Sequence, residues 1–331
     1  MGIKRLLKKS RLITTTYQMM RGIQSNVNQS AFLHGTGGTI SSRYCYSVFL
    51  RHLAHLHDCG MKEVPLRVAE FGPGDSIGIG LCAVLSGADA YYAMDVVKFA
   101  NASRNVQMFD ELVQLFERRE DIPGDAEFPK VKPVLREYAF PSHILTEARL
   151  ARSLDPERLK SLRGMLANER TEDAAGTLKI EYLAPWFDPS ITMPQVDLIL
   201  SQAVLEHVDD LPTIYRVMTD MLRPSGYMSH EIDFKSHGLT EEWNGHWVYS
   251  DAVWRVIRGK RPYLLNRMPL SAHRGMIEAH AFDILEINAE KANALPSIKR
   301  EKLSKTFRDM SDDDFATSTA YIVARARGAG A

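Results

Sequence analysis

The chain has 331 residues, of which 45% are hydrophobic and 25% charged, and its 41 acidic side chains balance its 41 lysines and arginines. This length suits one large or two modest globular domains with a substantial core. A membrane span needs about 20 apolar residues, and the longest uncharged apolar run, residues 76–88, is too short for one. The cysteines, Cys45, Cys59 and Cys82, are odd in number and form no C-x-x-C pair. They therefore indicate neither a disulfide framework nor a zinc site, and a cytoplasmic setting is expected.

Charge is distributed unevenly along the chain. Residues 1–57 contain no Asp or Glu, yet they hold the basic side chains Lys4, Arg5, Lys8, Lys9, Arg11, Arg21, Arg43 and Arg51. Each basic residue near an anionic membrane surface contributes about 1 kcal/mol of attraction. We therefore expect either peripheral contact with the inner face of a membrane or contact with a phosphate-bearing substrate. A solvated, partly frayed terminus is the alternative. A targeting segment also stays open, but a secretory signal peptide is not expected, because no sustained hydrophobic stretch follows the basic residues.

The first 60 residues are expected to form a basic arm followed by a helix. Residues 22–39 are polar and rich in glycine, which indicates a flexible loop. Ser41 is a good N-cap, and apolar residues recur at helical spacing after it: Tyr46, Phe49 or Leu50, Leu53 and Leu56.

The next segment has the pattern of a nucleotide site. Residues 66–71 form an apolar run that predicts a buried strand, and residues 77–86 predict a helix. Between them stands Gly72-Pro-Gly74, and glycines before a helix N-terminus let the backbone approach a ligand closely. The dinucleotide fingerprint G-x-G-x-x-G fails here, because Ile77 occupies the position of the third glycine.

With Glu70 two residues before Gly72, the loop resembles motif I of the Rossmann-like (class I) S-adenosylmethionine-dependent methyltransferases. The resemblance implies that the loop lies against the methionine end of the cofactor and that the acid orients the loop and the amino group. The residues implied in cofactor binding here are Glu70, Phe71, Gly72, Gly74 and Ser76.

Residues 90–95 predict a second strand, which ends in Asp95. At this distance after the glycine loop, a carboxylate is expected to accept hydrogen bonds from a ribose diol, with Val96 beside it. A strand-end turn aspartate is the alternative interpretation.

After the helix indicated over residues 106–116, the chain departs from a minimal methyltransferase. Residues 121–177 contain several prolines and two charged helical segments, and we expect an inserted helical cap that lies over the site and supplies the acceptor pocket. Residues 178–183 predict the third strand. Trp186 follows it, either as a contact to the adenine or as a residue packed beneath the cap.

Residues 196–208, which include Leu205-Glu-His-Val208, resemble motif IV of the same family, and residues 221–226 resemble the turn that leads into its fifth strand. The resemblance covers roughly residues 66–234. With two final strands at 283–289 and 317–324, it implies a doubly wound, mostly parallel seven-stranded α/β sheet over residues 61–331. Ser201 ends the fourth strand and is expected at the cofactor. Capped helices are expected over 250–259 and from Ser271.

Methyl transfer to a hydroxyl requires an aligned acceptor and a group that takes its proton. Asp233 and His237 are four residues apart and could form a base with an orienting carboxylate, and His207 is a further catalytic candidate. With Glu206 these groups could instead surround a divalent cation such as Mg²⁺, although no metal-binding motif is present and none is predicted. Candidates on the substrate side, for the acceptor or the carboxylate end of the cofactor, are Arg43, Tyr44, His230 and His246.

The stretch 232–271 looks loosely similar to methyltransferases encoded with bacterial surface-polysaccharide enzymes. We therefore expect O-methylation of a glycan or small-molecule hydroxyl, with S-adenosylmethionine as cofactor. A nicotinamide-dependent oxidoreductase or epimerase, and a non-catalytic cofactor-binding scaffold, are the alternatives. A nucleic-acid partner is not expected, because the basic residues lie at the terminus and no Asn/Asp-Pro-Pro-Tyr pattern follows the fourth strand. The acceptor, the atom methylated, metal dependence and the oligomeric state stay open.

Overall fold

The computed structural model describes residues 11–32 and 38–328, and a seven-stranded sheet crosses them in the order β3-β2-β1-β4-β5-β7-β6. The strands are β1 (Arg67–Phe71), β2 (Ala90–Met94), β3 (Lys179–Leu183), β4 (Val196–Gln202), β5 (Leu222–Asp233), β6 (Phe282–Lys291) and β7 (Thr317–Ala326). Strands β1 to β5 pair in parallel, and β7 pairs in antiparallel with β5 on one side and β6 on the other. The predicted mostly parallel α/β sheet is therefore confirmed.

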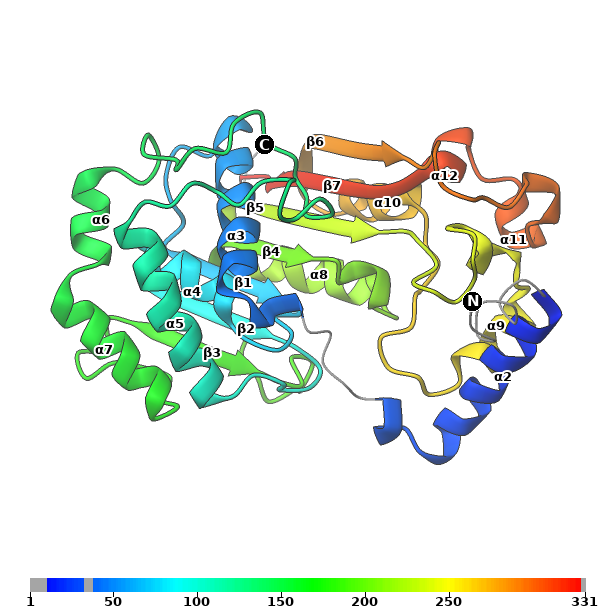
Figure 1. Cartoon of the computed structure of the whole chain (residues 1–331), viewed down its shortest axis with the longest axis horizontal. Coiled ribbons are helices and arrows are strands. Elements are labelled where there is room, and N and C mark those ends of the chain that lie inside the picture. The colour runs from blue at the N-terminus through cyan, green and yellow to red at the C-terminus, as the bar shows by residue number, and fades with distance from the viewer. Residues whose placement is uncertain (1–10, 33–37, 329–331) are drawn as a thin grey trace.

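Helices cover both faces of the sheet (Figure 1). One face carries α3 (Ser42–Asp58), α4 (Gly78–Leu85) and α5 (Ala102–Glu117), and the other carries α8 (Leu211–Met221) and α10 (Leu270–Ala279). Alternation along β1 explains the two cores, because successive side chains of a strand point to opposite faces. Val68 packs in the first core, and Ala69 and Phe71 pack in the second.

Several predicted boundaries agree with the structure. Ser41 caps α3 by accepting a hydrogen bond from the Tyr44 amide at 3.3 Å, and Ser250 caps α9 (Asp251–Arg258) in the same way. The turn predicted over residues 221–226 is wrong in extent, because β5 already begins at Leu222 and shifts register against β4 between Val196 and Leu198.

The inserted segment contains helices, as expected, but these helices lie away from the carboxyl edge of the sheet. Its extended part approaches that edge, where Lys132 pairs with Glu290 at 3.0 Å and Phe128 lies edge-on to Tyr44. Its helices α6 (Glu147–Ser153) and α7 (Pro156–Ala167) pack on the layer of α4 and α5. Arg158 of α7 donates to the Ala88 carbonyl at 2.7 Å, immediately before β2 begins. These helices therefore lie at the amino end of the strands, opposite the edge where ligands bind in such sheets.

A different part of the chain lies beyond the carboxyl ends of the strands. Helix α2 (Arg11–Val27) packs there against α9 (Figure 1). Gly22 permits the close crossing, since a Cβ at this position would lie 1.9 Å from the Val256 carbonyl oxygen. The expectation of a flexible loop from residue 22 was thus wrong for residues 22–27, which complete α2. The basic residues Lys4, Arg5, Lys8 and Lys9, and with them the predicted membrane contact, lie outside the described residues.

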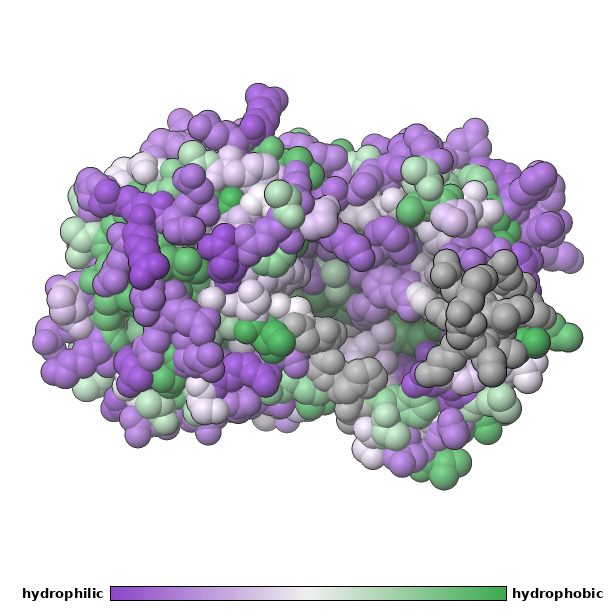
Figure 2. Space-filling model, in the orientation of Figure 1, coloured by the Kyte–Doolittle hydropathy of each residue, from purple (hydrophilic) through white to green (hydrophobic). Residues whose placement is uncertain are grey.

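On the face shown in Figure 2, the surface is hollowed between the sheet-bearing body and the part that carries α2 and α9. Among residues 11–32 and 38–328, no helix combines the length and apolar character needed to cross a bilayer.

Candidate functional site

The candidate site lies along the carboxyl edge of β1, β2, β4 and β5. Because these strands are parallel and in register, their last residues meet at one edge. We call Glu70, Gly72, Gly74, Asp95 and Trp186 the glycine-loop cluster, and Glu206, His207, Glu231, Asp233 and His237 the histidine cluster.

The loop after β1 requires both of its glycines. Gly72 and Gly74 have φ values of 69° and 73°, a region that L side chains rarely adopt. The Gly72 amide donates to the Met94 carbonyl at 2.8 Å. A Cβ on Gly72 would lie 2.6 Å from Val204 Cγ2. The loop is therefore held between the end of β2 and the turn that follows β4.

Ser76 and the preceding amides are held by the segment in front of α3. Thr39 Oγ1 accepts hydrogen bonds from the amides of Asp75 at 2.9 Å and Ser76 at 3.2 Å, and the Ser76 hydroxyl donates to the Thr39 carbonyl. Because this hydroxyl already donates within the protein, the predicted cofactor contact of Ser76 stays a prediction.

Glu70 lies beneath the loop, in the interior. Its side chain is only 2% exposed, and Tyr91 donates its hydroxyl to Glu70 Oε2 at 2.6 Å. Burial raises the pKa of Glu70 to about 8; the Tyr91 hydrogen bond opposes this rise, and the nearby charge of Asp95 adds to it. This position suits an acid that supports the loop from below.

Asp95 and Trp186 join the loop at the end of β2. Asp95 Oδ1 accepts a hydrogen bond from the Val96 amide at 2.7 Å. Burial raises the pKa of this carboxyl group, and the amides of Val96, Val97 and Gly74 counteract the rise. The Trp186 amide donates to the Asp95 carbonyl at 2.9 Å, and its ring lies edge-on to Phe71 with centroids 5.5 Å apart. The structure thus brings these predicted cofactor residues together.

The second cluster follows β4 and β5. The Asp233–His237 pair that the spacing predicts is present, with Oδ2 3.4 Å from Nε2. The His207 and His237 rings stand 5.0 Å apart, and His207 Nε2 lies 4.0 Å from Glu206 Oε1. Lys235 Nζ donates to Asp233 Oδ1 at 2.8 Å. Catalytic roles for these residues stay predictions.

Burial and neighbouring charges shift the pKa values of the histidine cluster. Burial alone would raise the pKa of Asp233, but its bonds to His237 and Lys235 hold the pKa well below its usual range. Burial raises the pKa of Glu231 to about 8, with Asp233 adding to the rise, and raises that of Glu206 well above its usual value. Burial lowers the pKa of His207 to about 4. At neutral pH, His207 is therefore uncharged.

Some predicted site residues have their side chains engaged elsewhere in the protein. Arg43 turns to the inserted segment, where its guanidinium pairs with Glu127 at 2.7 Å and Glu120 at 3.3 Å. His230 is fully buried, and its Nδ1 lies 2.8 Å from Ser201 Oγ. These two predicted site residues therefore engage each other inside the sheet.

The other two substrate-side candidates lie closer to the clusters. His246 is buried with its ring 4.8 Å from that of Trp247. Burial lowers the pKa of His246 to about 3, and the charges of Arg267 and His237 add to this fall while Asp233 opposes it. Burial raises the pKa of the partly buried Tyr44 well above its usual value, and the charges of Glu231 and Glu70 add to the rise. For all four candidates, contact with a substrate stays a prediction.

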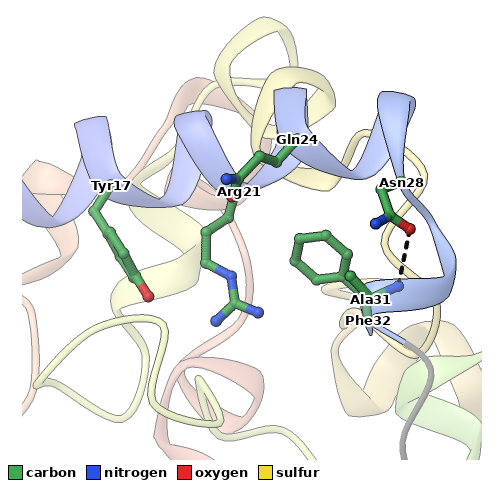
Figure 3. A pocket seen from close by; sticks show the side chains of 6 residues that line it. All are labelled: Tyr17, Arg21, Gln24, Asn28, Ala31 and Phe32. Carbon is green, nitrogen blue, oxygen red and sulfur yellow. Dashed lines mark hydrogen bonds between the residues drawn. The ribbon is translucent and has the colours of Figure 1, made fainter.

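A pocket on α2 was not predicted from the sequence. The pocket measures about 370 Å³ and is lined by Tyr17, Arg21, Gln24, Asn28, Ala31 and Phe32 (Figure 3). The Arg21 guanidinium lies 4.9 Å from the centre of the Phe32 ring. Nearby, Arg261 donates to Gln18 Oε1 at 2.9 Å, and Arg258 pairs with Asp209, just after the turn that holds His207. The helical spacing of Tyr17, Arg21, Gln24 and Asn28 is the signal that could have revealed this pocket.

Comparisons with known proteins found similar solved structures only. No protein-family model matches the chain, and no curated protein matches its sequence. Among solved structures, it is similar to an S-adenosylmethionine-dependent methyltransferase from Mesorhizobium loti, with 10% identity over 83% of this chain and 97% of that one and a TM-score of 0.39. It is also similar to an S-adenosylmethionine-dependent methyltransferase from Methanosarcina mazei, with 9% identity over 83% of this chain and 98% of that one and a TM-score of 0.40. A third similar structure is the N-methyltransferase NodS from Bradyrhizobium japonicum, with 12% identity over 84% of this chain and 95% of that one and a TM-score of 0.35. These likenesses concern the course of the chain and assign no residue a role.

Proposed function

We propose that this protein is an S-adenosylmethionine-dependent methyltransferase that methylates a hydroxyl group of a glycan or small molecule. The observation that carries the proposal is that the positive-φ loop at Gly72 and Gly74 meets the end of β2. The Gly72 amide donates to the Met94 carbonyl, and the Gly74 amide acts on the Asp95 carboxylate and opposes the rise of its pKa that burial causes. Glycines open the backbone to a ligand at this edge, and a carboxylate at the end of the next strand suits a ribose diol.

The transfer itself is an in-line displacement. The bond between the methyl carbon and the sulfonium sulfur breaks as the bond from the acceptor oxygen to that carbon forms, which leaves S-adenosylhomocysteine and a methyl ether. The hydroxyl proton passes to His237, which Asp233 orients from 3.4 Å. An imidazole is suited to accept this proton near neutral pH.

The pocket on α2 supports an acceptor that carries a negative group. Among the described residues, Arg21 lies over the Phe32 ring rather than beside a carboxylate. Burial lowers the pKa of Arg261 to about 10, and the charges of Arg21 and Arg258 add to this fall. Guanidinium groups bind phosphate and carboxylate through paired N–H donors. An anionic sugar or a phosphate-linked glycan fits this charge, and it also fits the basic composition of residues 1–57.

The test is calorimetric titration of the full chain with S-adenosylhomocysteine and, separately, with NADH. We expect micromolar binding of the first alone. Asp95→Ala should weaken it about 10- to 100-fold, because a hydrogen bond to a charged group contributes about 1.5–3 kcal/mol. Asp89→Ala, at the opposite end of β2, is the matched control and should leave binding unchanged. Binding of NADH alone would replace the proposal with an oxidoreductase, and binding of neither would favour a scaffold.

A further inference from the structure

The turn after β4 holds a buried carboxylate that is only weakly hydrogen-bonded. Glu206 is 3% exposed, and neither of its carboxylate oxygens accepts a hydrogen bond of good geometry within the described part of the chain. Burial raises the pKa of Glu206 well above its usual value, and the nearby amides of Glu206 and Asp233 oppose this rise only in part. His207 Nδ1 is buried and also lacks a hydrogen bond of good geometry. Buried polar groups are nearly always paired, since an unpaired one costs about 1–3 kcal/mol and a charged one costs more. Methyl transfer by a His237–Asp233 base does not account for Glu206.

These groups converge with His237 from two separate turns. Glu206, His207 and His237 each offer one ligand atom, and the three atoms lie within 4.8 Å of one another. Metal bonds to nitrogen or oxygen of about 2.0–2.2 Å set ligands on one ion about 3–4 Å apart. The His237 side chain is partly exposed, at 31%, so a small rotation of its ring can close the difference.

We propose that Glu206, His207 and His237 bind a divalent transition-metal ion at the carboxyl edge of β4 and β5. Two imidazoles with one carboxylate favour ions such as Zn²⁺, Fe²⁺ or Co²⁺, whereas Mg²⁺ prefers oxygen ligands alone. Three protein ligands leave a coordination position for an exogenous oxygen. Asp233, 3.4 Å from His237 Nε2, is placed as the outer carboxylate that orients a metal-binding imidazole.

The role of such an ion rests on the proposed function, but its binding does not. In methyl transfer, an ion bound to the acceptor hydroxyl lowers the pKa of that hydroxyl. In that case His237 would serve as a metal ligand instead of the proton acceptor proposed above, and the proton of the ion-bound hydroxyl would pass to solvent water. Metal binding can be measured with no acceptor or cofactor present.

A second group with metal-ligating atoms serves as an internal control. His55, Cys59 and Glu286 also lie within 4.8 Å of one another. Their side chains already engage each other, since Glu286 Oε2 accepts from Cys59 at 3.4 Å and lies 3.2 Å from His55 Nε2. An ion bound there would have a thiolate ligand, which gives Co²⁺ an intense near-ultraviolet charge-transfer band. The proposed site has only nitrogen and oxygen ligands and gives no such band.

The experiment is titration of the chelator-treated full chain with Co²⁺, followed by visible absorption, and with Zn²⁺, followed by calorimetry. We expect one ion per chain, with no thiolate band. Glu206→Gln keeps the side-chain shape, and His237→Ala changes a partly exposed residue; each should weaken binding at least about 100-fold, as expected for loss of a direct ligand. Cys59→Ala should leave it unchanged. Circular dichroism establishes that each variant is folded, and if Glu206→Gln is not, His237→Ala decides the question.

Absence of bound ion, equal binding by the wild-type chain and His237→Ala, or a thiolate band lost in Cys59→Ala would each overturn the inference. Titration of the same sample with S-adenosylhomocysteine separates the two proposals. Cofactor binding without metal binding would support the proposed function and exclude the metal site. Metal binding without cofactor binding would support the metal site and contradict the proposed function.

Discussion

The two clusters at the carboxyl edge of the sheet differ in how their buried carboxyl groups are hydrogen-bonded. In the glycine-loop cluster, Glu70 accepts from Tyr91 at 2.6 Å and Asp95 accepts from the Val96 amide at 2.7 Å. In the histidine cluster, both oxygens of Glu206 and Oε2 of Glu231 are buried without a hydrogen bond of good geometry from the described residues. The polar groups of the first cluster are therefore paired within the protein, whereas those of the second are buried and only weakly paired.

This difference suggests a division of labour. A cluster whose polar groups are already paired is rigid before its ligand arrives, which reduces the ordering cost of binding. A cluster with weakly paired carboxyl groups and a neutral imidazole stores unfavourable free energy that a substrate or an ion can release, and such sites are commonly functional. We therefore expect changes in the histidine cluster to affect turnover and changes in the glycine-loop cluster to affect stability and cofactor affinity.

The largest effect is expected from His237→Ala. Loss of a general base or of a metal ligand should lower kcat for methyl transfer about 10²- to 10⁴-fold, and the affinity for S-adenosylhomocysteine should stay unchanged. Single-turnover kinetics with calorimetry measures both quantities. His143→Ala, in the exposed part of the inserted segment, is the matched control. An equal fall in cofactor affinity would show that the two clusters do not act separately.

The second prediction concerns Gly72→Ala in the glycine-loop cluster. The substitution meets a φ of 69° and places a Cβ 2.6 Å from Val204, so it should lower the free energy of unfolding by about 2–4 kcal/mol. Gly60→Ala shares a positive φ of 98° with nothing within 4 Å of its Cβ, and should cost only about 1 kcal/mol. Urea unfolding measures both. The double change Gly72→Ala with Val204→Ala should recover part of the difference, and equal costs for the two glycines would contradict a role for Val204 in fixing the loop.

The third prediction concerns the pH dependence of the free energy of unfolding that the buried Glu231 causes. Burial raises the pKa of Glu231 from 4.5 to about 8, so between these values the folded state holds a proton that the unfolded state has lost. The free energy of unfolding therefore falls as pH rises through this range. Glu231→Gln removes this group's share of the fall and should be more stable than the wild type at pH 8.5 by about 1–2 kcal/mol, with little difference at pH 4.5. The exposed Glu301→Gln should show no such dependence, and a Glu231→Gln variant destabilised at high pH would refute the argument.

The glycine-loop cluster was predictable from sequence because its chemistry is local. Glu70, Gly72 and Gly74 lie within one turn, and Asp95 ends the next strand, so alternation and turn chemistry suffice to place them. The Asp233–His237 pair was predictable for the same reason, since four residues separate the two.

The rest depends on contacts between distant segments. A glycine inside a helix disfavours helix prediction, so the sequence around Gly22 did not indicate that α2 continues through it. The structure explains this glycine by the close crossing of α2 with α9. The inserted segment was expected above the site, but the apolar residues of α6 and α7 pack on α4 and α5 at the other end of the sheet. Proline and charge patterns reveal an insertion, but they do not state which end of the sheet it covers.

The smallest expected effect comes from Arg43, which composition and position predicted as a site residue. Its guanidinium pairs with Glu127 and Glu120, and those hydrogen bonds and charges hold its pKa above the usual value. Because the three side chains are about 40% exposed, solvent weakens the pairs, and Arg43→Ala should cost less than about 1 kcal/mol of stability. Its KM for the acceptor should equal that of the wild type, whereas Arg21→Ala, in the pocket on α2, should raise KM several-fold. A raised KM for Arg43→Ala with unchanged stability would instead show that the inserted segment forms part of the acceptor site beside the histidine cluster.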